Sequence, residues 1–350
     1  MTKEHLREMN YKIGSNSDVM HWFSSSGTTG LPVVYPWTYQ DEECALRSLK
    51  RIHPKEKFSR GGSALIIAPT GLPSMWAHMH RQLSFMGYAT VFPGIDSPKR
   101  LLNLIPHIKP TLLMSLPLAL TRLGELWQFS GGDHSVHPET IFVAGDVLSP
   151  ARRDRLSSIW NAQVHNFYGI SEIFGPLAAE TEDPSTFAWQ APEVHVEILD
   201  PVTMKPVNEG NTGVAIFTTL WERPAQLIRY WSGDLFKLVS WLAPGQPRFI
   251  AKGRQQISLP GIKNGTYPVD IDQILLSDSS LGTEWTAELQ SDRVTIFCES
   301  TNSIEEVCPQ TLQLLENSFS IPVHLQIVSP GYLDRSRQKL GLPNLGETTE

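Results

Sequence analysis

The sequence predicts an α/β protein with a large N-terminal domain of mixed and parallel sheets flanked by helices. In the first half of the chain, short apolar runs alternate with longer amphipathic runs, as in parallel strands joined by crossover helices. Further on, short extended runs are divided by Pro, Gly and Asn, which predicts an antiparallel, β-rich subdomain. The last part mixes helix and strand patterns and predicts a small α+β C-terminal domain.

The parallel layers rest on buried strands separated by amphipathic helices. The apolar runs predict strands at 63–68, 89–92, 111–115, 140–144 and 163–168. The amphipathic runs predict helices at 74–87, 97–107, 118–128 and 150–160. Ser74 and Ser149 are the expected N-caps of the first and the last of these helices, and Pro150 suits a first helical turn.

The later elements are shorter and set the domain boundaries. Extended pieces are expected at 194–199, 213–220, 227–230 and 234–238. The C-terminal part is expected to hold a helix at 268–276, strands at 285–289 and 294–299, a second helix with a Ser303–Glu306 capping box, and a strand at 323–328. We therefore predict a core domain at 1–253, with its α/β layers ending near residue 180 and its β-rich subdomain at 181–253, and a mobile domain at 254–350.

Composition excludes several classes of protein. With 41% hydrophobic and 19% charged residues the chain has a folded profile, and its net charge of -7 argues against a nucleic-acid surface. Cys44, Cys298 and Cys308 show neither metal-ligand nor disulfide spacing, so reduced thiols are expected. No stretch reaches about 18 apolar residues, and the N-terminus lacks a signal-peptide core. We expect a cytoplasmic protein that does not enter a membrane.

Residues 24–30 form a loop of seven small residues, Ser-Ser-Ser-Gly-Thr-Thr-Gly. Its backbone N–H groups and hydroxyls are unobstructed by side chains, so the loop is a candidate phosphate-binding site. It is not a Walker loop, because no Gly-Lys-Ser/Thr follows. Taken alone, a flexible turn explains the loop equally well.

Further motifs follow this loop in order. They are Ala144-Gly145-Asp146-Val147-Leu148-Ser149, Tyr168-Gly169-Ile170-Ser171-Glu172 and Ile228-Arg229-Tyr230-Trp231-Ser232-Gly233-Asp234-Leu235. Over residues 22–340 the chain thereby resembles the acyl-adenylate-forming (ANL) superfamily, and within it the phenylacetate-CoA ligase branch. The phosphate loop of that family corresponds to Ser25, Ser26, Gly27, Thr28, Thr29 and Gly30, and the lysine that usually follows is Val33 here. Fewer residues precede the loop than in that branch, so the chain is expected to be a shortened member.

The resemblance implies a site for ATP and AMP. Gly145 and Asp146 would line the adenine, and Tyr168 would stack on it. Gly169 allows close backbone approach, and Asp234 would accept the ribose hydroxyls. The residues agree with this reading, because ligands bind at the carboxyl ends of strands in open α/β sheets.

The resemblance places the chemistry at Ser171, Glu172 and Lys339. Ser171 would approach the α-phosphate, and Glu172 would bind Mg²⁺ as a hard oxygen ligand. A serine-hydrolase elbow at Ser171 fails, because Ile173 stands where its second glycine should be. Lys339, in the Arg-Ser-x-Gly-Lys-like segment 334–339, would neutralise carboxylate and α-phosphate oxygens as they approach, the alternative being an exposed tail lysine.

The C-terminal part departs from the family pattern. Gly253-Arg254 resembles the start of the mobile domain, with Arg254 near the nucleotide, but Gln256 stands at the hinge in place of an Asp. Asp272 replaces a usual glutamate, and Gln338 a usual glycine. These departures leave a normal domain swing and the second half-reaction open.

The expected substrate is a small aromatic carboxylic acid in a pocket between Trp76, Ala144 and Phe167 to Ile170. The expected function is ATP- and Mg-dependent formation of acyl-AMP in a specialised biosynthetic pathway. Coenzyme A is the family's default acceptor, while a carrier-protein phosphopantetheine and handover of acyl-AMP to a downstream enzyme stay open, as does a homodimer. The alternative from another class is a non-catalytic nucleotide-binding relic acting through protein contacts.

Other polar residues are expected to be structural. Arg152, Arg153 and Arg155 are interpreted as a solvated helix face. His78 and His80, two residues apart on a helix, face apart and do not suit a metal pair.

Overall fold

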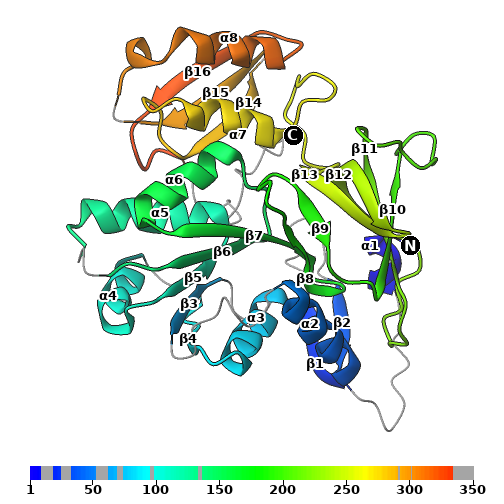
Figure 1. The fold of residues 1–350 in the computed structure, drawn as a ribbon. Coiled ribbons are helices and arrows are strands. Elements are labelled where there is room, and N and C mark those ends of the chain that lie inside the picture. Colours follow the sequence, from blue (N-terminus) through cyan, green and yellow to red (C-terminus); the bar gives the residue numbers. More distant parts are fainter. Residues whose placement is uncertain are drawn as a thin grey trace. The chain divides into compact units, whose positions relative to one another are not determined.

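The computed structural model describes residues 1–8, 19–24, 33–52, 62–68, 74–94, 98–132, 136–290, 292–300 and 302–333 (Figure 1). The chain divides into two compact units. Unit 1 comprises Met1–Ser115, Asp133–Gly145 and Ala162–Ala251, and unit 2 comprises Leu116–Gly132, Asp146–Asn161 and Lys252–Glu350. The domain boundaries expected from the sequence stay predictions.

Unit 1 is built on an 11-stranded sheet with the strand order β10-β11-β12-β13-β9-β8-β7-β6-β5-β3-β4 (Figure 1). Its parallel half holds β3 (Ser63–Ile67), β4 (Ala89–Val91), β5 (Leu112–Ser115), β6 (Thr140–Ala144) and β7 (Gln163–Ile170). The other half holds β8 (Phe174–Glu180), β9 (Phe187–Trp189), β10 (Val194–Leu199), β11 (Thr212–Thr219), β12 (Tyr230–Ala243) and β13 (Gln246–Arg254). Antiparallel pairing begins between β7 and β8, which confirms the predicted change from parallel layers to a β-rich part.

Four helices and a hairpin complete the described part of unit 1. They are α1 (Lys3–Glu8), β1 (Val19–Ser24) paired with β2 (Val34–Thr38), α2 (Tyr39–Ile52), α3 (Ser74–Phe85) and α4 (Pro98–Ile108). Both α2 and α3 contact β8. One hydrophobic cluster joins Leu6 of α1 and Val33 before β2 to Ile173 and to aromatic side chains of the sheet such as Phe217 and Phe249. This cluster positions the turn that follows β7.

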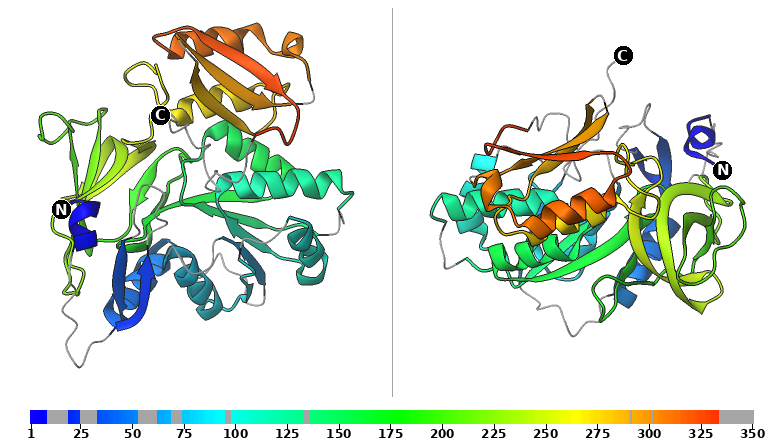
Figure 2. Two further views of the ribbon diagram at one scale, coloured as in Figure 1. Left: turned by 180° about the vertical axis from the view of Figure 1, so that it is seen from behind. Right: turned by 90° about the horizontal axis from the view of Figure 1, so that it is seen from above.

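Unit 2 combines two helix pairs with a three-stranded sheet. Its elements are α5 (Pro117–Phe129), α6 (Pro150–Trp160), α7 (Pro268–Ser277), β14 (Trp285–Gln290), β15 (Arg293–Glu299), the 3₁₀ helix η2 (Ile304–Glu306), α8 (Pro309–Ser318) and β16 (Val323–Val328). Strand β15 pairs antiparallel with β14 and parallel with β16, and α8 lies alongside this sheet (Figure 2). Its core holds Leu275 of α7, Trp285 and Ile296 of the sheet, and Leu315 of α8.

Several predicted boundaries are wrong. β7 continues two residues beyond Tyr168, and residues 227–229 are not a strand. β12 runs unbroken through Ser232-Gly233-Asp234, where the sequence favours a turn. A bulge explains that error, because three β12 residues lie opposite the single residue Ala215 of β11.

The predicted caps have mixed outcomes. Ser149 caps α6 as expected, its hydroxyl accepting a hydrogen bond from the Arg152 backbone N–H at 3.1 Å. Ser303 and Glu306 cap η2 rather than α8, which begins at Pro309. The thiols of Cys44, Cys298 and Cys308 are free. No helix in the described ranges is long and apolar enough to cross a membrane.

Candidate functional site

The carboxyl end of β7 brings together residues from two of the sequence motifs. Tyr168 is half-buried in β7, and its hydroxyl donates a hydrogen bond of 2.5 Å to Oδ2 of Asp234 on β12. Gly169 lies where the β7–β8 register shifts, opposite the three β8 residues 175–177, so the extra residues of this irregularity belong to β8. The Tyr168 ring packs edge-on against Phe236 and Phe249, at centroid distances of 4.9 and 5.6 Å. Two residues 66 positions apart therefore share one corner of unit 1.

Asp234 is held by the bulge in β12. Its backbone N–H donates to the Ser232 hydroxyl at 3.0 Å, and that hydroxyl donates to the Ala215 carbonyl at 2.7 Å. Gly233 between them has φ of 78°, a left-handed conformation that favours glycine. The Ser-Gly-Asp sequence thus bends the strand and aims the Asp234 carboxylate at Tyr168.

Glu172 lies in the turn between β7 and β8 and is only 6% exposed. Its Oε1 accepts a hydrogen bond from the Tyr230 hydroxyl at 3.2 Å and lies 3.6 Å from the Lys3 ammonium of α1. Its carbonyl accepts a hydrogen bond of 3.1 Å from Arg223, whose guanidinium also lies 3.2 Å from Asp41. A buried carboxylate needs such partners, and this one has a phenol and a cation.

Four residues predicted to hold the acid are buried in unit 1, namely Trp76, Ala144, Phe167 and Ile170. Ala144 ends β6 and is the register partner of Phe167 on β7, so these two residues are neighbours. Phe167 also packs edge-on against Phe142 at 4.9 Å. Ile170 belongs to the main hydrophobic cluster, and Trp76 is buried on α3. Their role as a pocket stays a prediction.

Of the other predicted residues, Gly145 and Ser171 belong to unit 1, Asp146, Arg254 and Gln256 belong to unit 2, and the rest lie outside the described residues. Gly145 is the residue after which the chain passes from unit 1 to unit 2, and its φ is 84°. The Asp146 carboxylate accepts a hydrogen bond of 2.8 Å from the Val147 N–H. Arg254 ends β13, and Gln256 is exposed in the turn after it. Ser25 to Gly30, between the paired Ser24 and Val34, and Lys339 lie outside the described residues, as do Gln338 and the segment around it.

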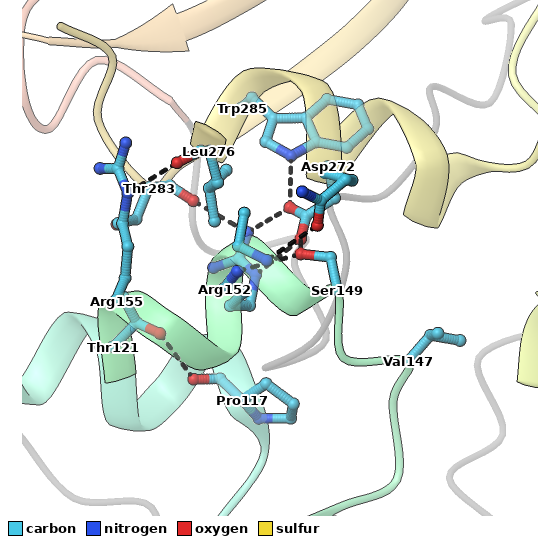
Figure 3. A network of polar contacts seen from close by, with 12 residues as sticks. Pro117, Thr121, Val147, Ser149, Arg152, Arg155, Asp272, Leu276, Thr283 and Trp285 are labelled. Atoms are coloured by element: carbon cyan, nitrogen blue, oxygen red, sulfur yellow. Dashed lines mark hydrogen bonds and ion pairs between the residues drawn. The ribbon is translucent and has the colours of Figure 1, made fainter. Parts of the chain in front are cut away.

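Unit 2 holds a buried ion pair at α6 and α7 (Figure 3). The side chains of Arg152 and Asp272 are 3% and 1% exposed, and Arg152 donates to both carboxylate oxygens, at 2.6 and 3.1 Å. Asp272 also accepts hydrogen bonds from the Ser149 hydroxyl at 2.6 Å and the Trp285 indole at 2.9 Å. Although burial would raise the pKa of Asp272, Arg152 and these donors hold it below its usual value.

The interpretation of Arg152 and Arg155 as a solvated helix face is therefore wrong. Arg155 donates three hydrogen bonds, of 2.8 to 3.1 Å, to the carbonyl of Leu276 in the last turn of α7 and to those of Asp278 and Leu281 beyond its end. The Leu276 carbonyl, in the last turn of α7, has no partner within the helix, and the Arg155 guanidinium supplies one. Both arginines serve the packing of α6 against α7.

A third polar cluster, missed from the sequence, lies between α2 and α3. Glu42 accepts hydrogen bonds from Trp37 at 3.1 Å and Arg81 at 3.0 Å, and lies 2.9 Å from Nδ1 of His78. His78 is fully buried and stacks on Trp37 at 3.7 Å. Burial alone would raise the pKa of Glu42, but His78 and Arg81 outweigh it and lower the pKa to about 2. The spacing of His78 and Arg81 on one helix face was the available signal.

Comparison with known proteins gives the family of this chain. A family model described as AMP-binding enzyme matches residues 4–218, more than half of the chain. The chain belongs to this family.

Its relatives include phenylacetate-coenzyme A ligases. The one from Thermus thermophilus is 30% identical over 62% of this chain, and the match spans 50% of that ligase. The one from Escherichia coli is 26% identical over 97% of this chain and 82% of that ligase. The chain thus spans about half the length of the first of these relatives.

Solved structures share the fold. A 2-hydroxyisobutyryl-CoA ligase in complex with R3-HIB-AMP, in its postadenylation state, superposes with a TM-score of 0.81 at 20% identity, covering 98% of this chain and 79% of that chain. The anthranilate CoA ligase AuaEII in complex with anthranoyl-AMP gives 0.66 at 15% identity, covering 92% of this chain and 65% of that chain. These likenesses confirm the predicted superfamily fold.

Proposed function

We propose that the chain activates a carboxylic acid with ATP, forming acyl-AMP and releasing pyrophosphate. The observation that carries the proposal is the contact between Tyr168 and Asp234 at the carboxyl end of β7. Two residues from separate motifs meet there, at the end of the strands where open α/β sheets bind ligands. Membership of the AMP-binding family supports an adenine nucleotide as the ligand.

Tyr168 and Asp234 are proposed to hold the nucleoside. The carboxylate of Asp234 accepts the Tyr168 hydroxyl, so ribose hydroxyls would share or displace that hydrogen bond. The Tyr168 ring is already fixed by Phe236 and Phe249, and a fixed aromatic face suits stacking on adenine. Gly145 is a proposed further nucleotide contact within unit 1, as are Ser25 to Gly30 for the phosphates, while the roles of Asp146 and Arg254 stay predictions from the sequence.

The environment of Glu172 fits a Mg²⁺ ion. Its Oε1 is occupied by Tyr230 and Lys3, while its Oε2 accepts no hydrogen bond from any described residue. In the described ranges no three His, Cys, Asp or Glu side chains cluster, which suits a cation that takes one protein carboxylate and keeps its waters and phosphate ligands. When bound, Mg²⁺ would neutralise phosphate charge.

The proposed reaction is an in-line displacement. A carboxylate oxygen of the acid attacks the α-phosphorus, the bond to the bridging oxygen breaks, and pyrophosphate leaves with the bonding electrons. Ser171 would orient the α-phosphate, and Lys339 would neutralise the approaching carboxylate. The side chains do no covalent chemistry in this step, so positioning and charge decide the rate.

We propose an aromatic acid as the substrate and coenzyme A as the acceptor. The neighbours Ala144 and Phe167, with Ile170 and Trp76, would supply an apolar wall for an aryl group. The names of the related phenylacetate-coenzyme A ligases support this choice of acid class and acceptor. The neutral, exposed Gln256 at the expected hinge favours a second candidate, adenylation with handover of acyl-AMP to a partner.

The test incubates the protein with ATP, Mg²⁺ and a panel of arylacetic, benzoic and aliphatic acids, with and without coenzyme A. Acyl-AMP, pyrophosphate and acyl-CoA are measured by mass spectrometry and coupled assay. We expect pyrophosphate release with arylacetic acids. Release without acyl-CoA would favour handover, and AMP binding without release for any acid would make the chain a nucleotide-binding relic.

A further inference from the structure

We infer that Lys3 is a phosphate-binding residue of the proposed site, contacting the β- and γ-phosphates of ATP beside Glu172. The inference rests on the proposed function and adds a residue that none of the sequence motifs contains. Lys3 lies on α1, far in sequence from β12, the strand that carries Tyr230. Its ammonium nevertheless lies 3.6 Å from Oε1 of Glu172, the oxygen that Tyr230 also contacts.

The position of Lys3 is fixed by the packing of α1. Leu6, one turn further along the helix, is buried in the main hydrophobic cluster of unit 1. On the other side of Lys3, the carbonyl of Met1 accepts a hydrogen bond of 2.8 Å from the Trp231 backbone N–H on β12. Lys3 therefore stands between two anchors, and its ammonium is held close to the Glu172 carboxylate.

The ammonium of Lys3 lies beside Glu172, and the Lys3 side chain is still partly exposed to solvent. The Lys3 side chain is 26% exposed, whereas that of Glu172 is 8% exposed. A lysine ammonium has three donors, so one can face Glu172 while the others face a ligand. Arg223, the other cation touching Glu172, is buried and paired with Asp41, so it cannot turn to a ligand.

Val33, which follows the proposed phosphate loop, carries no charge and lies in the main hydrophobic cluster of unit 1. Val33 follows the loop at the place where the resembling family has a lysine, and it is fully buried. It belongs to one hydrophobic cluster with Leu6 of α1 and Ile173 next to Glu172. The residue that follows the proposed loop, α1 and the Glu172 turn therefore share one hydrophobic core, and Lys3 is a cation that α1 places beside Glu172.

Charge balance explains the need for Lys3. Bound Mg²⁺ would offset only part of the negative charge that the ATP polyphosphate brings towards the carboxylate of Glu172, and like charges at short range repel. A lysine beside that carboxylate neutralises it and attracts the terminal phosphates as a point charge. AMP lacks the terminal phosphates, so its binding would not depend on Lys3.

The test measures ATP, AMP and inorganic pyrophosphate binding by calorimetry, with Mg²⁺ present, for the wild-type protein and the variants Lys3→Gln and Lys3→Arg. Lys205→Gln, at an exposed loop lysine, is the matched control. We expect Lys3→Gln to weaken ATP and pyrophosphate binding by roughly fivefold, about 1 kcal/mol, with AMP unchanged. Lys3→Arg should recover most of the loss, and circular dichroism should show all variants folded.

Two results would overturn the inference. If ATP affinity stays the same in Lys3→Gln, or if ATP and AMP affinity fall together, Lys3 only anchors α1. The proposed function fails separately, because a protein that binds ATP in a Lys3-dependent way but releases no pyrophosphate with any acid is a binding module. A wild-type protein that binds neither ATP nor pyrophosphate contradicts both.

Discussion

Replacing Asp272 by Asn should destabilise unit 2 far more than a surface substitution would. Asp272 accepts four hydrogen bonds, two from Arg152, one from Ser149 and one from Trp285, at 2.6 to 3.1 Å. The substitution leaves the Arg152 guanidinium buried without its counter-ion, and breaking one partner of such a pair costs about 3–5 kcal/mol. Asp154→Asn, an exposed carboxylate on the same helix as Arg152, should change stability by less than about 0.5 kcal/mol.

Native-state hydrogen exchange of α7 and β14 amides measures this loss, because it reports the opening of unit 2 separately from that of unit 1. The double variant Arg152→Met with Asp272→Leu should recover much of the stability, since replacing both partners leaves no unpaired charge. A loss below about 1 kcal/mol for Asp272→Asn would refute the reasoning, because an exposed ion pair contributes that little. A double variant less stable than the single one would refute it equally.

Glu42→Gln should make the free energy of unfolding depend less on pH below 4.5. The pKa of Glu42 is about 2 against an ordinary 4.5, so above pH 4.5 its carboxylate stabilises unit 1 by up to roughly 3 kcal/mol. This stabilisation is lost as the pH falls from 4.5 towards 2. Urea unfolding at about pH 3 and about pH 6 checks this, and equal pH dependence in both proteins contradicts it. Gly124→Ala should cost unit 2 about 1–3 kcal/mol, because a Cβ would lie 2.2 Å from Ile159 and 2.7 Å from the Trp160 indole nitrogen; an unchanged unfolding midpoint would count against this packing. Tyr168→Ala should weaken AMP binding by about tenfold in calorimetry, since stacking of a base on an aromatic ring contributes about 1–3 kcal/mol, and wild-type affinity would remove Tyr168 from the site. Lys339→Ala should slow adenylation sharply and leave ATP affinity nearly intact, whereas equal activity would make Lys339 a bystander.

The parallel half of unit 1 was predictable because buried parallel strands are short, continuous apolar runs. Residues 112–115 and 140–144 lie within such runs. Both segments are strands whose consecutive side chains are buried, so both faces of the sheet are covered there. Helix α6 was equally readable, from Ser149 and Pro150 at its start. Local signals sufficed wherever local packing and long-range pairing agree.

The β-rich half shows where local signals mislead. Ser232-Gly233-Asp234 has turn chemistry, and the backbone does bend there, with a left-handed Gly233. Pairing with β11 nevertheless continues on both sides of the bend, so the structure has a bulge and one long strand. The pairing of β12 with β11 decides whether these residues form a turn or a bulge. The sequence of residues 232–234 alone does not indicate that pairing.

The site was harder to predict from the sequence because its side chains contact residues that are distant in the chain. Tyr168 and Asp234 were found because each stands in a motif, and their contact follows from the sheet order. The pairing of Arg152 with Asp272, 120 residues away, leaves no trace in helix periodicity, which only shows that a charge is present. Lys3 stands in no motif, and only the packing of α1 reveals that it meets Glu172.

Acid-dependent exchange of labelled pyrophosphate into ATP tests the central claim most directly, because it requires reversible formation of acyl-AMP. We predict exchange when an arylacetic acid is added to the wild-type protein with Mg²⁺, little exchange without acid, and at least a tenfold decrease in Asp234→Ala. Exchange that no carboxylic acid stimulates, in a protein that binds AMP at Tyr168 and Asp234, would contradict the assignment of acid activation to this site.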